Sequence, residues 1–262
     1  MKRSLTLAMG ILMTLPIAQA AAAHIECTAI SGHSTVALLE LYTSEGCSSC
    51  PPADRWFAEL AQEKFGPDRL IRLAFHVDYW NDLGWRDPFS QSGFSQRQRE
   101  IAQRAGARTI YTPEFVLNGK EYRRGFSNSI GDDVSQINQR SAQAALTLTL
   151  TLARNNSSLH VTGSASLVSA VLEPTQLFIA VVENNLENHV RAGENEGRTL
   201  HHDAVVRRLA PPLKLNFSET LRVDQHVLLD KTWKTNDLSV VAFVQSTRNN
   251  EVLQAIALPL CH

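Results

Sequence analysis

The chain has 262 residues, with 25 basic and 26 acidic side chains and a formal net charge of −1. This near balance provides no electrostatic attraction for nucleic acid or an anionic membrane surface, so we expect neither as a partner. Beyond the N-terminus no stretch is apolar for long enough to span a bilayer.

The N-terminus has the layout of an export signal. Lys2 and Arg3 precede an apolar run over residues 5–17, and small alanine-rich sequence follows it. The run is shorter than the roughly 20 residues that a membrane-spanning helix needs. We predict a signal peptide over residues 1–23 and a periplasmic or secreted protein with no membrane insertion after cleavage. A retained membrane anchor is the alternative.

The next elements alternate between strand and helix. Pro51 and Pro52 suit a first helical turn, Gly66 and Gly106 suit helix ends, and Asn118-Gly119 suits a tight hairpin turn. The pattern predicts strand, helix, strand, helix, strand, strand, helix, over residues 36–42, 51–66, 69–77, 95–106, 114–117, 121–123 and 127–143.

The pattern changes near Ser141. Leu and Thr alternate strictly in "ALTLTLTLA", which is typical of a half-buried strand, and further strands are predicted over residues 159–167, 176–183, 213–221, 238–246 and 252–260. Several short strands with polar spacers favour an antiparallel β-sandwich. We therefore predict two domains, residues 24–142 and 143–262.

A polar segment, "RAGENEGRTLHHDAVVRR", interrupts these strands. It contains His201, His202 and Asp203, and its simplest interpretation is a solvated connection between strands. The alternative is a loop that contributes to a partner or ligand site.

The four cysteines suggest disulfides in an oxidising compartment, where three pairings are possible. Cys47 and Cys50 form a local pair, which leaves Cys27 and Cys261 as a candidate structural disulfide. Tying the chain ends in this way could contribute about 4–5 kcal/mol on the loop-entropy model. Two unpaired thiols are the alternative.

Cys47 and Cys50 lie where a predicted strand meets a predicted helix, in "GCSSCPP". The helix dipole contributes about 0.3–1 kcal/mol to a thiolate, whereas lowering a thiol pKa from about 8.5 to about 7 takes roughly 2 kcal/mol. Amide or hydroxyl donors near Ser49 have to supply the rest, and Glu45 opposes them as a like charge. We expect Cys47 to attack, with a moderately lowered pKa, and Cys50 to be the more buried resolving thiol.

Glu40 is an acid within the apolar run that leads to the cysteines. If buried, it can accept the Cys50 proton while a mixed disulfide is resolved. The alternative is a side chain that points to solvent at the sheet edge.

The order of elements, the C-x-x-C after the first strand and the proline that opens the third strand resemble the thioredoxin fold over residues 35–142. More closely, "ELYTSEGCSSCPPAD" and "HVDYWNDLGWRDP" resemble a thioredoxin-like family of exported bacterial proteins of unknown function. The resemblance implies an α/β thioredoxin-like domain (β-α-β-α-β-β-α), and the strand pattern of the second half predicts that an antiparallel β-sandwich follows it.

The resemblance also implies a cis Thr112-Pro113 bond that exposes the Thr112 backbone beside the sulfurs. Glu40 matches the buried acid of thioredoxins with one extra residue in the turn. Ser48-Ser49 replaces the usual Gly-Pro, and Gly46 replaces the usual Trp. These departures leave the direction of the redox reaction open.

We therefore expect an exported thiol–disulfide oxidoreductase without a cofactor, whose partners are protein or small-molecule thiols and disulfides and an unidentified redox protein. One alternative is a copper chaperone that binds metal through Cys47, Cys50 and His76, because thiolates suit Cu(I). Others are a non-catalytic binding module and an inert disulfide. A covalent haem site is disfavoured because Pro51 stands where such a site needs His.

Four aromatic residues of the loop after residue 77 lie close together in sequence. They either form a wall near the cysteines or pack the loop against the domain: Tyr79, Trp80, Trp85 and Phe89.

Overall fold

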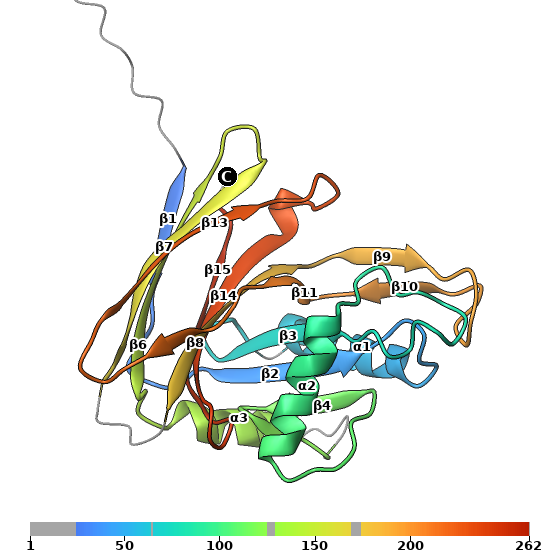
Figure 1. Ribbon diagram of the computed structural model, residues 1–262, viewed down its shortest axis with the longest axis horizontal. Coiled ribbons are helices and arrows are strands. Elements are labelled where there is room, and N and C mark those ends of the chain that lie inside the picture. The colour runs from blue at the N-terminus through green and yellow to red at the C-terminus, as the bar shows by residue number, and fades with distance from the viewer. Residues whose placement is uncertain (1–24, 64, 125–128, 169–173, 262) are drawn as a thin grey trace, which may run out of the picture.

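The computed structural model describes residues 25–63, 65–124, 129–168 and 174–261, and the predicted signal peptide lies outside them. Within these residues no helix is long and apolar enough to cross a membrane. The described chain is rich in β-structure, with several sheets and few helices (Figure 1).

A large sheet of nine strands runs through the described part of the molecule, in the order β15-β14-β8-β11-β3-β2-β4-β5, with β12 beside β8. Its strands are β2 (Ala37–Thr43), β3 (Leu70–His76), β4 (Glu114–Leu117), β5 (Lys120–Glu121), β8 (Thr175–Glu183), β11 (Val205–Leu209), β12 (Leu213–Leu215), β14 (Leu238–Ser246) and β15 (Val252–Pro259).

Two smaller sheets complete the β-structure of the described residues. Four strands form one of them, in the order β1-β6-β7-β13: β1 (Glu26–Ile30), β6 (Ala144–Leu152), β7 (Ser158–Leu167) and β13 (Leu221–Leu228). The other is the antiparallel hairpin of β9 (Leu186–His189) and β10 (Thr199–His202).

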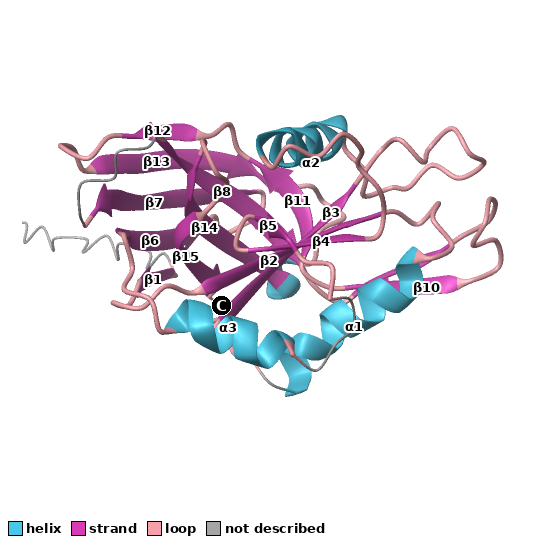
Figure 2. Ribbon diagram, turned by 90° about the horizontal axis from the view of Figure 1, so that it is seen from below, coloured by secondary structure: helices cyan, strands magenta, loops and turns pink. Residues whose placement is uncertain are grey.

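The helices cover the part of the large sheet that contains β2, β3 and β4. They are α1 (Cys50–Glu63), α2 (Ser92–Arg104) and α3 (Ile130–Asn138), and a short 3-10 helix spans Thr235–Asp237. Figure 2 shows α1 and α3 on one face of this sheet and α2 on the other. The Cys47–Cys50 pair therefore lies at the end of a sheet that is covered on both faces.

The elements from β2 to α3 follow one another in the predicted order. The hairpin between β4 and β5 turns at Asn118 and Gly119, whose φ values of 50° and 84° suit a type I′ turn. At Gly119 a Cβ atom would meet the Asn250 carbonyl oxygen, so only glycine fits there.

The second half differs from the prediction in several strands. The predicted strand over residues 213–221 is wrong, because the chain turns after β12 and begins β13 at Leu221. The pattern also missed β1, β9, β10 and β11, and the segment predicted as a solvated loop contains two of these strands. Strands β1 and β11 obtain their partners from distant parts of the chain, and β9 and β10 pair only with each other over four residues each. Periodicity over so few residues does not reveal such strands.

The nine-stranded sheet and the four-stranded sheet each contain strands from before and after the predicted domain boundary between residues 142 and 143. Strand β11 lies parallel to β3, with Val205 opposite Ala74, and β1 lies antiparallel to β6. Cys27 and Cys261 form a disulfide with their Cα atoms 6.0 Å apart.

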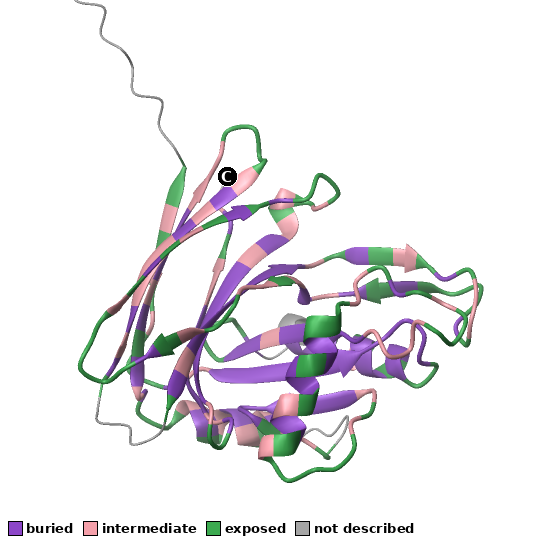
Figure 3. Cartoon of the chain, in the orientation of Figure 1, coloured by how far each residue is buried: buried purple, intermediate pink, exposed green. Residues whose placement is uncertain are grey.

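Two apolar cores lie on opposite faces of β8 and β14, and the first of them also covers both faces of β2, β3 and β4, whose residues are nearly all buried (Figure 3). One is formed between the helices and the β2–β3–β4 part of the sheet. The other lies between the four-stranded sheet and the inner faces of β8, β14 and β15, and its leucines include Leu146, Leu148 and Leu150. The alternating Leu-Thr tract thus points its leucines into a sandwich core.

Arg97 of α2 lies in the first core although it is charged. It donates to Glu40 at 2.9 Å (Nε to Oε2) and 2.7 Å (Nη2 to Oε1), and its guanidinium lies 4.8 Å from the Phe178 ring centroid and 5.2 Å from that of Phe243. Glu40 is fully buried and also accepts a hydrogen bond from the Tyr42 hydroxyl. This ion pair joins β2, α2 and the strands of the second half.

Replacing Arg97 tests this pair. Arg97→Ala leaves the Glu40 carboxylate buried without its charge partner, and we expect a loss of about 3–5 kcal/mol in the free energy of unfolding, measured by urea denaturation. Arg97→Lys, which keeps the charge but loses the paired donors, should fall between Arg97→Ala and the unchanged chain. The matched control is Arg123→Ala, which removes an exposed ion pair with Glu121 and should leave stability nearly unchanged. Equal losses for both alanine variants would contradict the interpretation.

Candidate functional site

The Cys47–Cys50 disulfide lies between β2 and α1, and Cys50 is the first residue of α1. The Cα atoms of the pair are 5.5 Å apart. The Cys50 amide donates to the Cys47 carbonyl at 3.2 Å, which closes the turn. At the start of a helix the free amides and the dipole favour negative charge, as a thiolate at this position requires.

Ser49 and Thr112 lie beside the Cys47 sulfur. The Ser49 hydroxyl oxygen is 3.2 Å from Cys47 Sγ, so it is placed to donate to a thiolate there. The Thr112 carbonyl oxygen is 3.8 Å from the same sulfur, and the Thr112-Pro113 bond is cis. Trp80 holds this segment in place, because its indole N–H donates to the Thr112 hydroxyl at 2.8 Å.

Gly46, which precedes the first cysteine, makes room for this tryptophan. A Cβ atom at Gly46 would lie 3.1 Å from Trp80 Cβ and 3.4 Å from its carbonyl oxygen. Trp80, in the loop after β3, is thus packed against Gly46 as well as hydrogen-bonded to Thr112.

The two cysteines are buried in this conformation, with Cys47 1% exposed and Cys50 0% exposed. Cys50 was expected to be the more buried thiol, but both sulfurs are closed off from solvent in this conformation. The physical reason is a cover from the second half of the chain, the segment between β9 and β10, which we call the hairpin tip (residues 190–198). Figure 1 shows β9 and β10 extending from the sandwich towards the cysteine end of α1.

Side chains of the hairpin tip bind backbone atoms of residues 45–48, in the segment that we call the cysteine turn (residues 44–50). The Glu194 carboxylate accepts a hydrogen bond from the Ser48 amide at 2.9 Å. The Asn195 side-chain amide donates to the carbonyl oxygens of Glu45 and Cys47 at 2.8 and 2.9 Å. Asn195 is itself fully buried. These contacts both order the turn and close off its sulfurs.

Beside the turn lies a group of two histidines and three carboxylates, which we call the acid–histidine cluster: Glu45, Asp54, His76, Asp87 and His202. All five residues are at most 7% exposed. Nδ1 of His76 is 2.7 Å from Asp87, and Nε2 of His202 is 3.2 Å from Glu45. Asp54, on α1, lies 3.8 Å from Nδ1 of His202. The remaining nitrogen of each ring, Nε2 of His76 and Nδ1 of His202, has no hydrogen-bond partner among the described residues.

The pKa values of the carboxyl groups in this cluster are shifted in opposite directions: that of Asp54 is raised and that of Asp87 is lowered. Burial raises the pKa of the Asp54 carboxyl, although His202 and His76 act in the opposite direction. Burial also opposes the charged forms of His76 and Asp87, but each stabilises the other, so the pKa of His76 is raised and that of Asp87 is lowered. Asp54 is thus a carboxyl group that takes up a proton at a higher pH than an ordinary aspartate.

Glu40 does not reach the cluster. Its carboxylate is held by Arg97 and Tyr42 on the face of β2 that α2 covers, so the alternative of a solvent-facing Glu40 is wrong. Tyr42, two residues further along β2, lies on the same face and donates its hydroxyl hydrogen to Glu40, as strand alternation requires. With Glu40 committed to Arg97, Asp54 is the buried acid on the cysteine helix.

His76 lies in the cluster, hydrogen-bonded to Asp87. The group of three potential metal ligands within 4.8 Å of one another in the described residues is His160, Asp224 and His226, which belong to β7 and β13. Because Cys47 and Cys50 are joined in a disulfide here, the copper alternative through Cys47, Cys50 and His76 stays a prediction.

Four residues of the site were not predicted from the sequence: Asp54, Asp87, Glu194 and Asn195. Asp54 is four positions after Cys50 in "CPPAD", and helical spacing could have placed it on the face of Cys50. The others come from loops, whose positions depend on tertiary packing. His202 was noticed but assigned to a solvated segment, whereas it is 4% exposed.

Two solved structures resemble this one. HBP35 of Porphyromonas gingivalis has a TM-score of 0.66 at 18% identity, covering 88% of this chain and 76% of its own. A protein of Agrobacterium tumefaciens has a TM-score of 0.59 at 19% identity, covering 88% of this chain and 100% of its own. At these identities the likeness concerns the fold alone.

No curated protein sequence matches the chain. A family model described as "Protein of unknown function (DUF1223)" matches residues 38–245, which include both halves of the fold and every residue of the acid–histidine cluster. The chain belongs to the DUF1223 family.

Proposed function

We propose that the protein is an exported thiol–disulfide oxidoreductase with Cys47 and Cys50 as its redox couple. The observation that carries the proposal is the position of Cys47 Sγ, 3.8 Å from the Thr112 carbonyl oxygen. A backbone carbonyl beside the sulfur can pair with the amide of an extended substrate and align its disulfide.

The arrangement of the neighbouring elements supports a thioredoxin-like interpretation of this half. Strands β3 and β2 are parallel, and β2–β4 and β4–β5 are antiparallel, in the sheet order β3-β2-β4-β5. Helices α1 and α3 lie on one face and α2 on the other (Figure 2). This is the order that the resemblance implies for a β-α-β-α-β-β-α unit.

The chemistry is two successive thiol–disulfide exchanges. The Cys47 thiolate attacks a substrate disulfide and forms a mixed disulfide, while the substrate thiolate leaves. Cys50 then loses its proton and attacks Cys47 Sγ, which releases the second substrate thiolate and forms the 47–50 disulfide. The substrate gains two electrons and the couple loses them, and the reverse sequence oxidises a substrate dithiol.

Asp54 is the proposed acceptor of the Cys50 proton. Both residues are buried on α1, one turn apart, and Glu40 is committed to Arg97. A carboxyl group whose pKa is raised towards that of its partner transfers a proton more readily than an ordinary aspartate does. Nδ1 of His202, 3.8 Å from Asp54 and without a hydrogen-bond partner among the described residues, is the nearest histidine nitrogen that could receive the proton after a small movement.

The hairpin tip controls access in this proposal. With Cys47 1% exposed, a substrate reaches it only when the contacts of Glu194 and Asn195 open. The substrates are protein or small-molecule disulfides and thiols, and a separate redox protein recycles the couple.

Trapping variants test the couple. Cys50→Ser should accumulate mixed disulfides on Cys47 when it is mixed with oxidised peptides, because the resolving thiol is absent, and Cys47→Ser should accumulate far fewer. Mass spectrometry of non-reduced digests measures the adducts, with Cys27 and Cys261 left intact in both variants. Equal adduct levels in the two variants, or no adducts in either, would contradict the assignment of Cys47 as the attacking thiol and Cys50 as the resolving thiol.

Loosening the hairpin tip should open the site. We expect Asn195→Ala to raise the rate at which a small reductant reduces the 47–50 disulfide, since the substitution removes two hydrogen bonds to the cysteine turn. Quenched-flow alkylation measures the rate, and Asn155→Ala, in the exposed turn after β6, is the control. An unchanged rate in Asn195→Ala argues against the tip as a cover.

Removing the carboxylate of Asp54 should slow resolution rather than attack. We expect Asp54→Asn to retard release of a preformed Cys47 mixed disulfide by about 10- to 100-fold, up to the lower end of what general bases contribute. Asp54 must be ionised to accept a proton, and its pKa is raised. As the pH is lowered, the rate of mixed-disulfide release in the unchanged chain should therefore begin to fall at a higher pH than the pKa of an ordinary aspartate would give.

The same pH limb should be absent in Asp54→Asn, and Glu40→Gln serves as the comparison. If Glu40→Gln removes that limb while Asp54→Asn keeps it, the proton acceptor is Glu40 and the assignment to Asp54 is wrong.

A further inference from the structure

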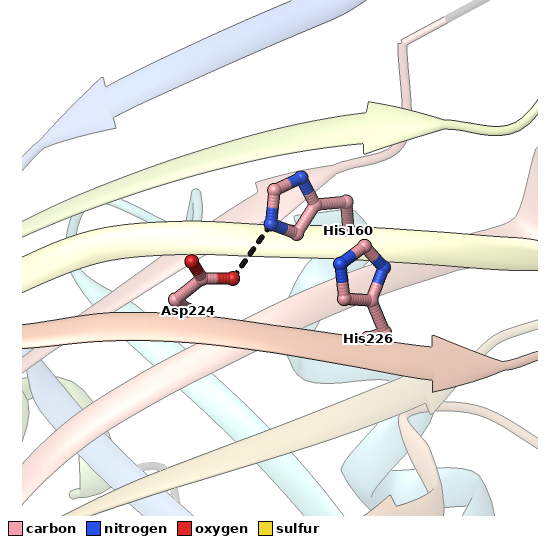
Figure 4. Close-up of side chains that lie close together, drawn as sticks. All are labelled: His160, Asp224 and His226. Atoms are coloured by element: carbon pink, nitrogen blue, oxygen red, sulfur yellow. Dashed lines mark hydrogen bonds and ion pairs between the residues drawn. The ribbon is translucent and has the colours of Figure 1, made fainter.

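The outer face of the four-stranded sheet carries two histidines and a carboxylate side by side, far along the chain from the cysteines (Figure 4). His160 on β7 lies directly opposite His226 on β13, and Asp224 lies two residues before His226. Their neighbours on both strands point into the sandwich core: Leu159, Val161, Val223 and Val227. Strand alternation therefore presents the three polar side chains on the opposite, outer face.

These side chains offer three potential ligand atoms within 4.8 Å of one another. Nε2 of His160 lies 2.8 Å from Oδ1 of Asp224, and the two imidazole rings are stacked with centroids 4.2 Å apart and planes 4° from parallel. The side chain of His160 is 35% exposed and that of Asp224 is 75% exposed, so an ion in solution can reach them.

The residue types select the kind of ion. Two imidazoles with one carboxylate suit divalent transition metals such as Zn²⁺, Cu²⁺ and Ni²⁺, whereas Ca²⁺ and Mg²⁺ prefer all-oxygen sites. Three protein ligands leave a fourth position for water on Zn²⁺. An exposed ion pair and a ring stack add little to stability by themselves, so folding does not account for this combination.

A shared metal requires a small adjustment of the rings. An ion lies near the plane of each imidazole that binds it, so two parallel rings must turn about their side-chain bonds to converge on one ion. Cβ atoms of residues directly opposite on antiparallel strands are about 4.5–5.5 Å apart, which permits this convergence without moving the backbone. Asp224 and His226 are exposed, so their side chains can turn towards the partly covered His160.

We propose that His160, Asp224 and His226 bind one divalent transition-metal ion of the Zn²⁺ class on the outer face of the sandwich. The site belongs to the second half of the chain and is independent of the redox couple, because none of its ligands contacts the cysteine turn or the acid–histidine cluster. Its register across β7 and β13 holds the ligands together, so the sandwich itself preorganises the site.

Zinc titration of the oxidised, untagged chain tests the proposal. With both disulfides formed, no thiolate competes for the ion. Isothermal titration calorimetry should detect one Zn²⁺ per chain at this site. Stepwise losses are expected: His160→Ala and His226→Ala should each weaken binding by more than about tenfold, a loss that even an outer-sphere partner can cause. Asp224→Asn should weaken it less than either histidine variant.

The matched control is His201→Ala. His201 is an exposed histidine on β10, and its Nδ1 lies 3.4 Å from the Glu187 carboxylate. It does not belong to a group of three potential metal ligands in the described part of the chain. This variant should bind Zn²⁺ like the unchanged chain. Thermal denaturation without metal should show the same midpoint for all variants, since the substituted side chains lie at the surface. No zinc binding by the unchanged chain, or the same binding in the double variant His160→Ala/His226→Ala, overturns the proposal.

Discussion

The parallel pairing of β11 with β3 is the constraint on which the rest of the site depends. Val205 lies opposite Ala74, and the Ala74 amide donates to the Ala204 carbonyl at 2.7 Å. This contact joins two halves that differ in architecture into one sheet. It also carries β10 and the hairpin tip onto the cysteine end of α1, where His202 and Asn195 reach Glu45 and the turn. Without this pairing the cysteines would have neither their cover nor half of their polar surroundings.

The buried charges follow from the same arrangement. One group, Glu40 with Arg97, lies on the α2 face of the sheet and is surrounded by aromatic rings from both halves. The other, the acid–histidine cluster, lies beside the turn at the strand ends. Burying a charge is costly unless it is paired, so each carboxylate lies near a cation or a hydrogen-bond donor. The two groups differ in their electrostatics: Glu40 forms an ion pair with Arg97, whereas burial raises the pKa of the Asp54 carboxyl group.

Both the surroundings of the Cys47–Cys50 disulfide and the outer face of the sandwich obtain their side chains from separate segments. Around Cys47 these are the turn itself, the loop with Trp80, the Thr112-Pro113 segment and the hairpin tip. On the sandwich they are the adjacent strands β7 and β13. A rigid sheet in each case holds side chains that would otherwise have to be ordered at an entropic cost. The long sheet thus lets one chain present two separate polar sites on one framework.

Local patterns in the sequence by themselves determined the elements from β2 to α3, the Asn118-Gly119 turn and the position of Cys47 and Cys50 between strand and helix. They could do so because strand and helix periods, turn residues and helix ends depend on near neighbours in the chain. The tertiary structure decided that Glu40 pairs with Arg97, that Asn195 covers the cysteine turn, and that His160 meets His226. These relations depend on which strands pair and in what register, and a shift of one residue reverses the face of every side chain in a strand.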